Sequence, residues 1–99
     1  MRFDLEMALA VLSRTPATLD ALLRDLPDEW TRHNEGPDTW SPYDVVGHLI
    51  DGEETDWMTR TRIILSDAPA EERRFVPFNR FAHLGAEAAR PLHERLERF

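Results

Sequence analysis

The segment from Ser41 to Leu65 constrains the fold most strongly, because it shows both where a helix begins and which face it buries. Ser41 is a favourable N-cap, Pro42 suits the first helical position, and Asp44 supplies an acid at the third. With a step of about 100° per residue, one broad face of this helix is apolar. That face carries Val45, Val46, Leu49, Ile50, Trp57, Ile63 and Ile64. We therefore expect a long amphipathic helix that packs against other helices.

A second helical pattern covers residues 3–26, where leucines recur at spacings of three and four. Pro16 lies inside this pattern and cannot continue a helix without a kink or a break. We predict the interruption near residues 14–16, with Thr15 as the cap of the second piece.

A third helical pattern covers residues 81–99 and is interrupted by Pro91. Its final part places apolar residues at helical spacing: Leu92, Leu96 and Phe99. Two long helices and part of a third predict an all-α fold with a single domain over residues 1–99.

Two loops separate these patterns. Residues 27–40 contain turn-forming residues and two tryptophans, Trp30 and Trp40, which can cover a core or line a pocket. Residues 66–80 lead into the aromatic sequence FVPFNRF around Pro77. That much apolar surface predicts that this loop folds back on the helices.

Composition excludes several classes of function. The net charge of −7 disfavours nucleic-acid binding, because an acidic surface repels phosphates. The chain has no cysteine, which excludes disulfides and thiolate ligands and suits a cytoplasmic protein. No apolar run is long enough to span a membrane, and the N-terminus lacks the features of a signal peptide.

His48 is the first candidate for chemistry. On the predicted helix, Val45, Gly52 and Thr59 lie within about 60° of it, so its neighbours leave room for a ligand. A histidine at the edge of the buried face suits a metal ligand inside a bundle. Periodicity alone favours the alternative, a half-buried histidine without a role, because one imidazole does not make a metal site.

Glu53 lies near the middle of the apolar face, about 140° from His48 by the same step. A carboxylate there is costly unless it is paired. We favour a salt bridge with Arg80 or another loop arginine, and the alternative is a base or a group that supports a metal ligand. The other acids of this helix are interpreted as a solvated face: Asp51, Glu54 and Asp56.

The remaining histidines lack the spacing of a helical metal site. An H-x-x-x-H pair places two ligands on one helical face, and the sequence contains none. These histidines are interpreted as structural or solvent-facing: His33, His83 and His93.

Three segments resemble the DinB-like superfamily, in order and at suitable spacing. The stretch TWSPYDVVGHLIDGEETDWMTRTRIIL, residues 39–65, is similar to the family's second-helix region, and FVPFNRF, residues 75–81, to the following loop of a subgroup. The opening FDLEMALAVLSRTPATLDALL resembles the first helix. The resemblance implies an antiparallel four-helix bundle, reduced here to about three helices because the family's last helix is absent.

The resemblance also implies a metal site. DinB-like proteins hold a divalent metal such as Zn, Ni, Mn or Fe with three histidines. His48 matches the first ligand, and the other two form an H-x-x-x-H pair on the absent helix. The implied chemistry is that of a hydrolase, or of a transferase that uses small-molecule thiols such as mycothiol or bacillithiol. Candidates for the pocket or for support of the ligand are Trp40, Glu53 and Trp57.

Two hypotheses about function remain. In the first, a metal site on His48 activates water or a thiol toward a small-molecule substrate. In the second, the chain is a non-catalytic helical module without metal, and its apolar stripe drives it to form a homodimer. A role in the response to DNA damage, suggested by the family name alone, is disfavoured by the acidic surface.

Overall fold

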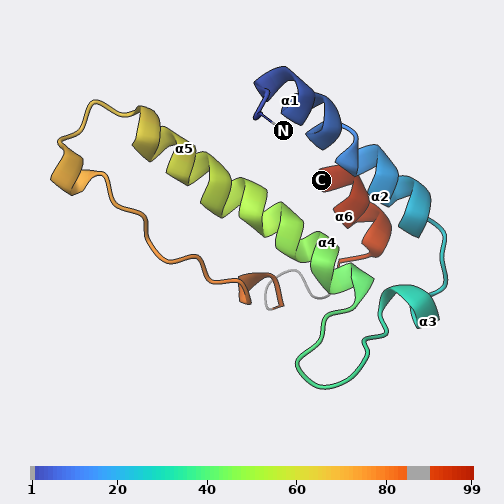
Figure 1. Ribbon diagram of the computed structural model, residues 1–99. Coiled ribbons are helices and arrows are strands. Elements are labelled where there is room, and N and C mark those ends of the chain that lie inside the picture. Colours follow the sequence, from blue (N-terminus) through green and yellow to red (C-terminus); the bar gives the residue numbers. More distant parts are fainter. Residues whose placement is uncertain (1, 85–89) are drawn as a thin grey trace.

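The computed structural model describes residues 2–84 and 90–99, and within these ranges the chain is helical and contains no strand (Figure 1). The first part consists of α1 (Leu5–Leu12), α2 (Thr15–Leu23) and the one-turn helix α3 (Asp28–Thr31). The prediction of an all-α fold is confirmed.

The second part is the long central helix, which has three consecutive segments. These are α4 (Pro42–Asp51), the π-helical segment η1 (Gly52–Trp57) and α5 (Met58–Leu65). The 3₁₀ turns η2 (Ala70–Glu72) and η3 (Ala82–Leu84) come next, and α6 (Leu92–Arg98) ends the described chain. No helix of the described residues has the length and apolarity that a membrane crossing requires.

The predicted start of the central helix is confirmed. The Ser41 hydroxyl accepts a hydrogen bond from the Asp44 backbone N–H at 3.2 Å, and the Asp44 carboxylate accepts one from the Ser41 N–H at 3.1 Å. This reciprocal capping box satisfies two of the free N–H groups at the beginning of α4. Pro42 is the first helical residue, where its missing N–H has no cost.

Two expectations for the N-terminal half need correction. The interruption near Pro16 is confirmed, but Thr15 is the first residue of α2 and Arg14 is its N-cap, without a side-chain hydrogen bond. Residues 27–40, predicted as a loop, contain α3, whose first turn carries Asp28 and Glu29. Acids at that position favour a helical turn because they interact with its free N–H groups.

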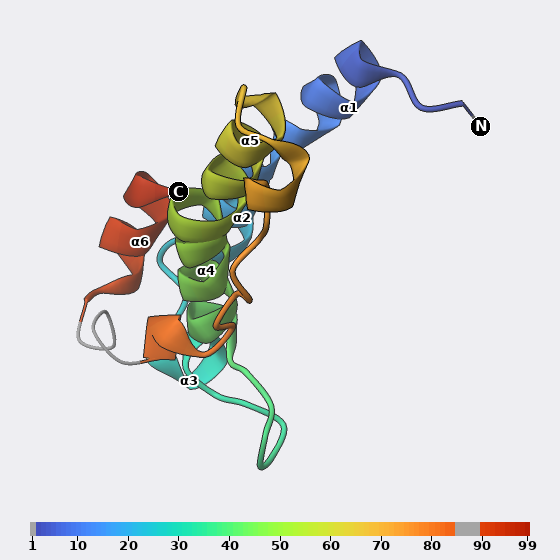
Figure 2. The ribbon, with the colours of Figure 1, turned by 90° about the vertical axis from the view of Figure 1, so that its left-hand side faces the viewer.

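The core is small and lies where α2, α4 and α6 meet (Figures 1 and 2). Val46 and Ile50 of α4 and Leu96 of α6 are buried at its centre. Partly buried apolar side chains surround them: Leu19, Leu23, Leu92 and Phe99. The helical spacing at the end of the sequence therefore correctly predicted the face by which α6 packs.

A buried arginine joins α6 to α4. Arg95 is only 2% exposed, and its Nη1 donates a hydrogen bond to the Tyr43 carbonyl oxygen at 2.9 Å. Its Cζ lies 3.8 Å from the centre of the Tyr43 ring, within the range of a cation–π interaction. The Tyr43 hydroxyl donates to the Arg90 carbonyl oxygen at 2.5 Å, which adds a second link between α4 and the chain that enters α6.

Gly47 makes room for this guanidinium. A Cβ at residue 47 would overlap Arg95 Nη1 and would lie 3.0 Å from Arg95 Cζ. The guanidinium cannot move aside without losing the Tyr43 contacts that keep a buried charge stable. Glycine at this position is therefore required by the close approach of α6.

The predicted apolar face is not buried along its whole length, because packing ends near α4 and no face of α5 is buried. Val46 and Ile50, before the π-helical segment, are buried, whereas Trp57 and Ile64, within and after it, are exposed. No residue of α5 is buried.

The molecule is open for a chain of its size. Its accessible surface is 7973 Å², whereas a folded monomer of this mass has about 5,800 Å². The radius of gyration is 16.3 Å, against about 13 Å for a compact chain of this length. Helix α1 has no buried residue and extends away from the core (Figure 2). The helices thus leave much apolar surface exposed.

We predict opposite effects of alanine at two buried glycines of the central helix. Gly47→Ala should lower the free energy of unfolding by about 1–3 kcal/mol, because the new methyl group overlaps Arg95. At Gly52 a Cβ would meet only ordinary contacts, the nearest at 3.6 Å from Trp57 Nε1. Gly52→Ala should therefore be neutral or stabilise by up to about 1 kcal/mol. Chemical denaturation measures both, and equal effects would contradict the role of the Arg95 contact.

Candidate functional site

His48 lies in a cluster of rings on the side of α4 that faces the loops. Its ring centre is 4.9 Å from that of Trp40, 5.7 Å from Phe78 and 5.5 Å from His83. Trp40 immediately precedes the cap of α4, Phe78 belongs to the extended chain after α5, and His83 lies in η3. Three segments distant in sequence therefore meet around one imidazole.

Trp40 holds the two imidazoles together. Its ring is tilted against His48 and packs edge-on against His83 at 4.7 Å, and Phe81 meets it edge-on at 6.2 Å. Aromatic pairs at such separations are attractive beyond the area they bury. The predicted folding-back of residues 66–80 is confirmed, since Phe78 reaches His48 and the Phe75 ring lies 4.8 Å from Arg60 Cζ.

His83 is the most deeply buried titratable member of the cluster. It is 3% exposed, and neither ring nitrogen has a hydrogen-bond partner among the described residues. Burial lowers the pKa of His83, and the nearby imidazole of His48 lowers it further. The carboxylates of Asp44 and Asp51 act on this pKa in the opposite direction. His83 is thus held as a neutral imidazole whose nitrogen lone pair is available to a ligand.

Asp51 lies three residues after His48, so both are on the same side of α4. Its Oδ2 is buried and has no hydrogen-bond partner within the described chain, as is also true of His48 Nδ1. Its Oδ1 is 3.3 Å from the Thr55 hydroxyl, which donates to it. Buried polar atoms normally have hydrogen-bond partners, so Asp51 Oδ2 and His48 Nδ1 are available to bind a ligand.

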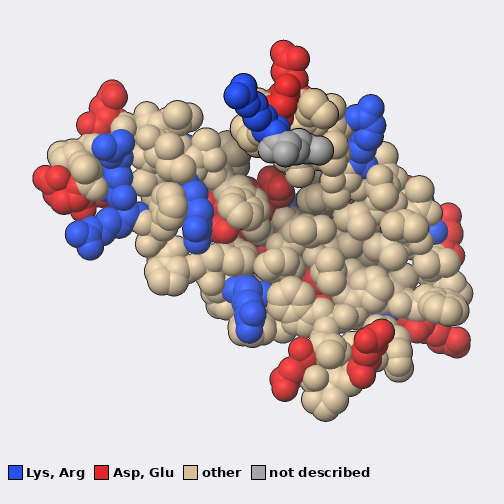
Figure 3. Space-filling view, viewed as in Figure 1, with Lys and Arg blue, Asp and Glu red and all other residues tan. Residues whose placement is uncertain are grey.

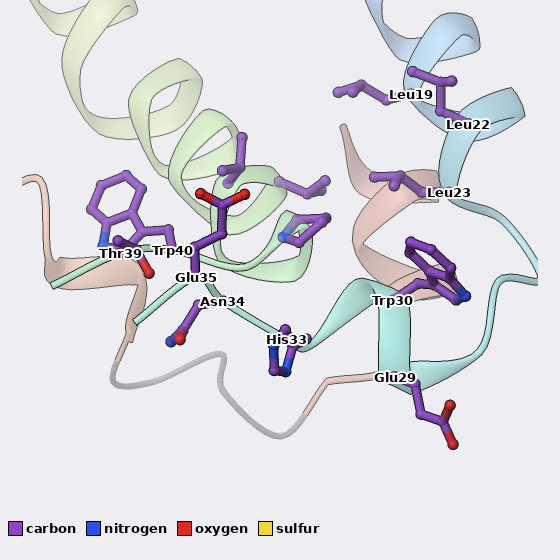
Figure 4. Close-up of a pocket in the computed structure, with 13 residues that line it drawn as sticks. Leu19, Leu22, Leu23, Glu29, Trp30, His33, Asn34, Glu35, Thr39 and Trp40 are labelled. Atoms are coloured by element: carbon purple, nitrogen blue, oxygen red, sulfur yellow. The ribbon is translucent and has the colours of Figure 1, made fainter. Parts of the chain in front are cut away.

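An open groove adjoins the cluster on the other side of Trp40. It has a volume of about 770 Å³ and lies between α2, α3 and the start of α4. Figure 4 shows Leu19, Leu22 and Leu23 on one wall and Trp40 on the other, with Glu35 and Asn34 on the connecting loop. An apolar hollow of this size with a few polar groups is typical of a site for a small molecule.

The metal implied by the resemblance fits these residues in donor type but not in number. Among the described residues, His48 Nδ1 and both ring nitrogens of His83 have no hydrogen-bond partner, and imidazole nitrogens suit a divalent transition metal. Within residues 2–84 and 90–99, however, no three His, Asp or Glu side chains lie close enough together to hold an ion. The H-x-x-x-H pair of the family pattern has no counterpart in the sequence.

Of the pocket candidates, the structure brings only Trp40 to His48. Glu53 and Trp57 are exposed on η1 and make no contact with the cluster in the part of the chain that is described. The favoured salt bridge of Glu53 with Arg80 is not found among the described residues. Arg80 instead lies over the Phe81 ring, with its Cζ 4.8 Å from the ring centre.

The acids interpreted as a solvated face behave differently from one another. Asp56 is buried and accepts a hydrogen bond from Arg60 Nε at 2.5 Å, so the expectation for it was wrong. Glu54 is exposed but forms a bidentate ion pair with Arg98 of α6, with distances of 2.9 and 2.7 Å. The Glu54–Arg98 pair depends on tertiary proximity, which a helical projection does not contain, whereas Asp56 and Arg60 are four residues apart and form a local pair.

Sequence reasoning missed His83. It was interpreted as structural or solvent-facing because no histidine lies three or four residues from it, and its partner is on another element. The only available signal was its position two residues after the aromatic sequence FVPFNRF, which was expected to fold back. His33 and His93, in contrast, are exposed as expected.

We predict that removal of Trp40 disrupts the cluster. Trp40→Ala should lower the free energy of unfolding by about 2 kcal/mol, because a half-buried indole that contacts both imidazoles is lost. Trp30→Ala is the matched control, since Trp30 is 72% exposed and should change stability by less than about 0.5 kcal/mol. Equal losses in thermal or chemical denaturation would show that Trp40 has no special structural role.

Comparison with known proteins agrees with this architecture. No curated protein gave a significant match to the chain. A family model described as the DinB superfamily matches residues 12–98, which are more than half of the chain and include every member of the ring cluster. Together with the all-α fold, this match shows that the chain belongs to the DinB superfamily.

Proposed function

We propose that this chain carries out metal-dependent chemistry on a small molecule, of the hydrolase or thiol-dependent transferase type, with His48 as a metal ligand. One observation carries the proposal: His48 lies inside a ring cluster, its buried Nδ1 has no hydrogen-bond partner within the described residues, and Trp40 of the cluster lines a groove of about 770 Å³. A satisfied core histidine would not combine unused nitrogen capacity with an adjacent hollow.

The residues around His48 have distinct roles in this proposal. A bound divalent metal would supply Lewis acidity toward water or a thiol. Trp40 contacts His48 and also lines the groove, so it connects the cluster to the place where a substrate would bind. The leucines of α2 bind the apolar part of a substrate, and Asn34 and Glu35 orient its polar groups. Exclusion of water strengthens each electrostatic interaction inside the site.

We predict that the purified chain retains about one zinc or nickel ion per site after metal loading and dialysis, and that His48→Ala abolishes this retention. His33→Ala is the matched control, because His33 is exposed and lies in the groove rather than in the cluster. Elemental analysis measures the retained metal, and circular dichroism checks that both variants keep their helices. If the wild-type protein retains no metal after loading and dialysis, the proposal is overturned. The loaded protein would then be assayed for hydrolysis and for consumption of a thiol.

We also propose a second candidate function, a self-associating helical module, because the surface area favours it independently. The exposed area of one chain exceeds that of a compact monomer by roughly 2,000 Å², which is more than the roughly 800 Å² that each partner buries in a stable dimer of ordinary size. Large exposed apolar side chains on α1 and on the distal half of the central helix account for much of it: Leu5, Leu9, Leu12, Trp57, Ile64 and Leu65. Figure 3 shows a broad surface of uncharged residues with both acidic and basic side chains around and within it.

For this candidate we predict a dimeric mass at micromolar concentration in analytical ultracentrifugation. Leu9→Glu should shift the chain toward monomer, because Leu9 lies between Leu5 and Leu12 on one stripe of α1 and is 56% exposed. Ala10→Glu places the same charge on the same helix about 140° from that stripe and is the matched control. A wild-type chain that sediments as a monomer at every concentration would exclude self-association.

A further inference from the structure

We propose that the groove between α2, α3 and α4 binds a lipophilic cation, a small molecule with an apolar body and a protonated amine or quaternary ammonium group. The inference deepens the proposed function, on which it rests for the reaction, by naming the class of molecule that the groove accepts. The juxtaposition that carries it is one hollow with apolar walls, two tryptophans and the carboxylate of Glu35, which has no ion-pair partner among the described residues.

The walls of the groove fit the apolar body of such a molecule. They are formed by leucines of α2 and valines of α4: Leu19, Leu22, Leu23, Val45 and Val46. Leu22 is 62% exposed and Val45 is 39% exposed, so apolar surface inside the groove remains in contact with water. Covering this surface with a hydrocarbon is favourable. The volume of about 770 Å³ lies within the usual range for small-molecule sites, about 300–1,000 Å³.

The charge of the groove is complementary to a cation. Apart from His33, the ionisable side chains that line it are acidic, Glu29 and Glu35, and no arginine of the described chain is among the lining residues. Figure 4 shows the Glu35 carboxylate pointing from the loop toward the helices, whereas Glu29 points away. The net charge of −7 also attracts cations and repels anions. The groove therefore favours an ammonium group over a carboxylate or a phosphate.

Two indoles give the groove a second means of attracting a cation. Trp30 of α3 and Trp40, just before α4, line it and lie on opposite sides of the view in Figure 4. The face of an indole attracts an ammonium group within about 6 Å of the ring centre, and aromatic rings are a recurrent means of binding quaternary ammonium groups. Trp30 is 72% exposed, so a bound ligand would cover a ring that the chain leaves in water.

Binding to the chain without added metal tests the inference, with decyltrimethylammonium below its micellar concentration as the cationic probe. Decanoate is the matched anion with a similar alkyl chain, and decanol is a neutral probe of the apolar walls. Calorimetry and tryptophan fluorescence measure the dissociation constants. We expect the cation to bind at least about tenfold more tightly than decanoate, because the carboxylate and the indoles attract the first head group and repel the second.

Substitutions identify the groups that recognise the cation. Glu35→Gln should weaken binding of decyltrimethylammonium about three- to fivefold, as expected for an exposed charge pair, and leave decanol binding unchanged. Trp30→Leu keeps an apolar side chain without the indole and should weaken binding of the cation about three- to tenfold. Glu71→Gln is the matched control, because Glu71 is exposed in η2 and lies outside the groove. Circular dichroism checks that each variant keeps its helices.

The outcomes separate this inference from the proposed function, because retention of metal is measured without a probe. A preference for the cation that falls in Glu35→Gln and not in Glu71→Gln supports the inference. Decanoate that binds as tightly as the cation overturns the cationic class and leaves the proposed role of His48 intact. A chain that binds the cation but retains no metal overturns the proposed function and leaves the binding inference intact.

A second copy of the chain is the alternative occupant of the groove. In that case the wild type is a dimer that binds none of the three probes, and Trp30→Leu lowers its mass in analytical ultracentrifugation to that of a monomer. This result would overturn the inference, as would a monomeric wild type that binds none of the probes.

Discussion

The buried guanidinium of Arg95 is the interaction on which the arrangement of the helices depends. It inserts into a notch that exists because residue 47 has no side chain, lies over the Tyr43 ring and donates to the Tyr43 carbonyl. The Arg32 guanidinium lies over the same ring, with its Cζ 3.9 Å from the ring centre. An apolar core as small as Val46, Ile50 and Leu96 gives α6 little specificity of position, and the directional contacts of Arg95 provide it.

This interaction divides α4 into three faces with different tasks. Tyr43 and Gly47, four residues apart, face Arg95, whereas Val46 and Ile50, also four apart, face the apolar core. His48 and Asp51 remain for the side that meets η3 and the returning loop. The ten residues of α4 thus contact α6, the apolar core and the ring cluster, and the helix that carries them begins at the capping box of Ser41.

Local signals in the sequence predicted local structure well. The cap at Ser41, the interruption near Pro16 and the packing spacing of Leu92 and Leu96 depend on neighbours within a few residues, and the structure has all of them. The sequence predicted only one of the two histidines of the ring cluster. His48 lies on a helix whose periodicity indicates its position, whereas His83 reaches the cluster through a loop. The exposure of Trp57 was not predictable, since the periodicity of one helix does not show whether another element packs against its distal half.

The π-helical segment also lies between a packed half and an exposed half of the central helix. A wider turn absorbs an insertion or deletion of one residue by rotating the helix beyond it, so α5 can turn by about 100° while α4 stays in its notch. The distal half of the helix, α5, has no buried residue, so most substitutions there change its surface and leave the core unchanged. Changes there would alter what the molecule meets without altering the ring cluster that His48 occupies.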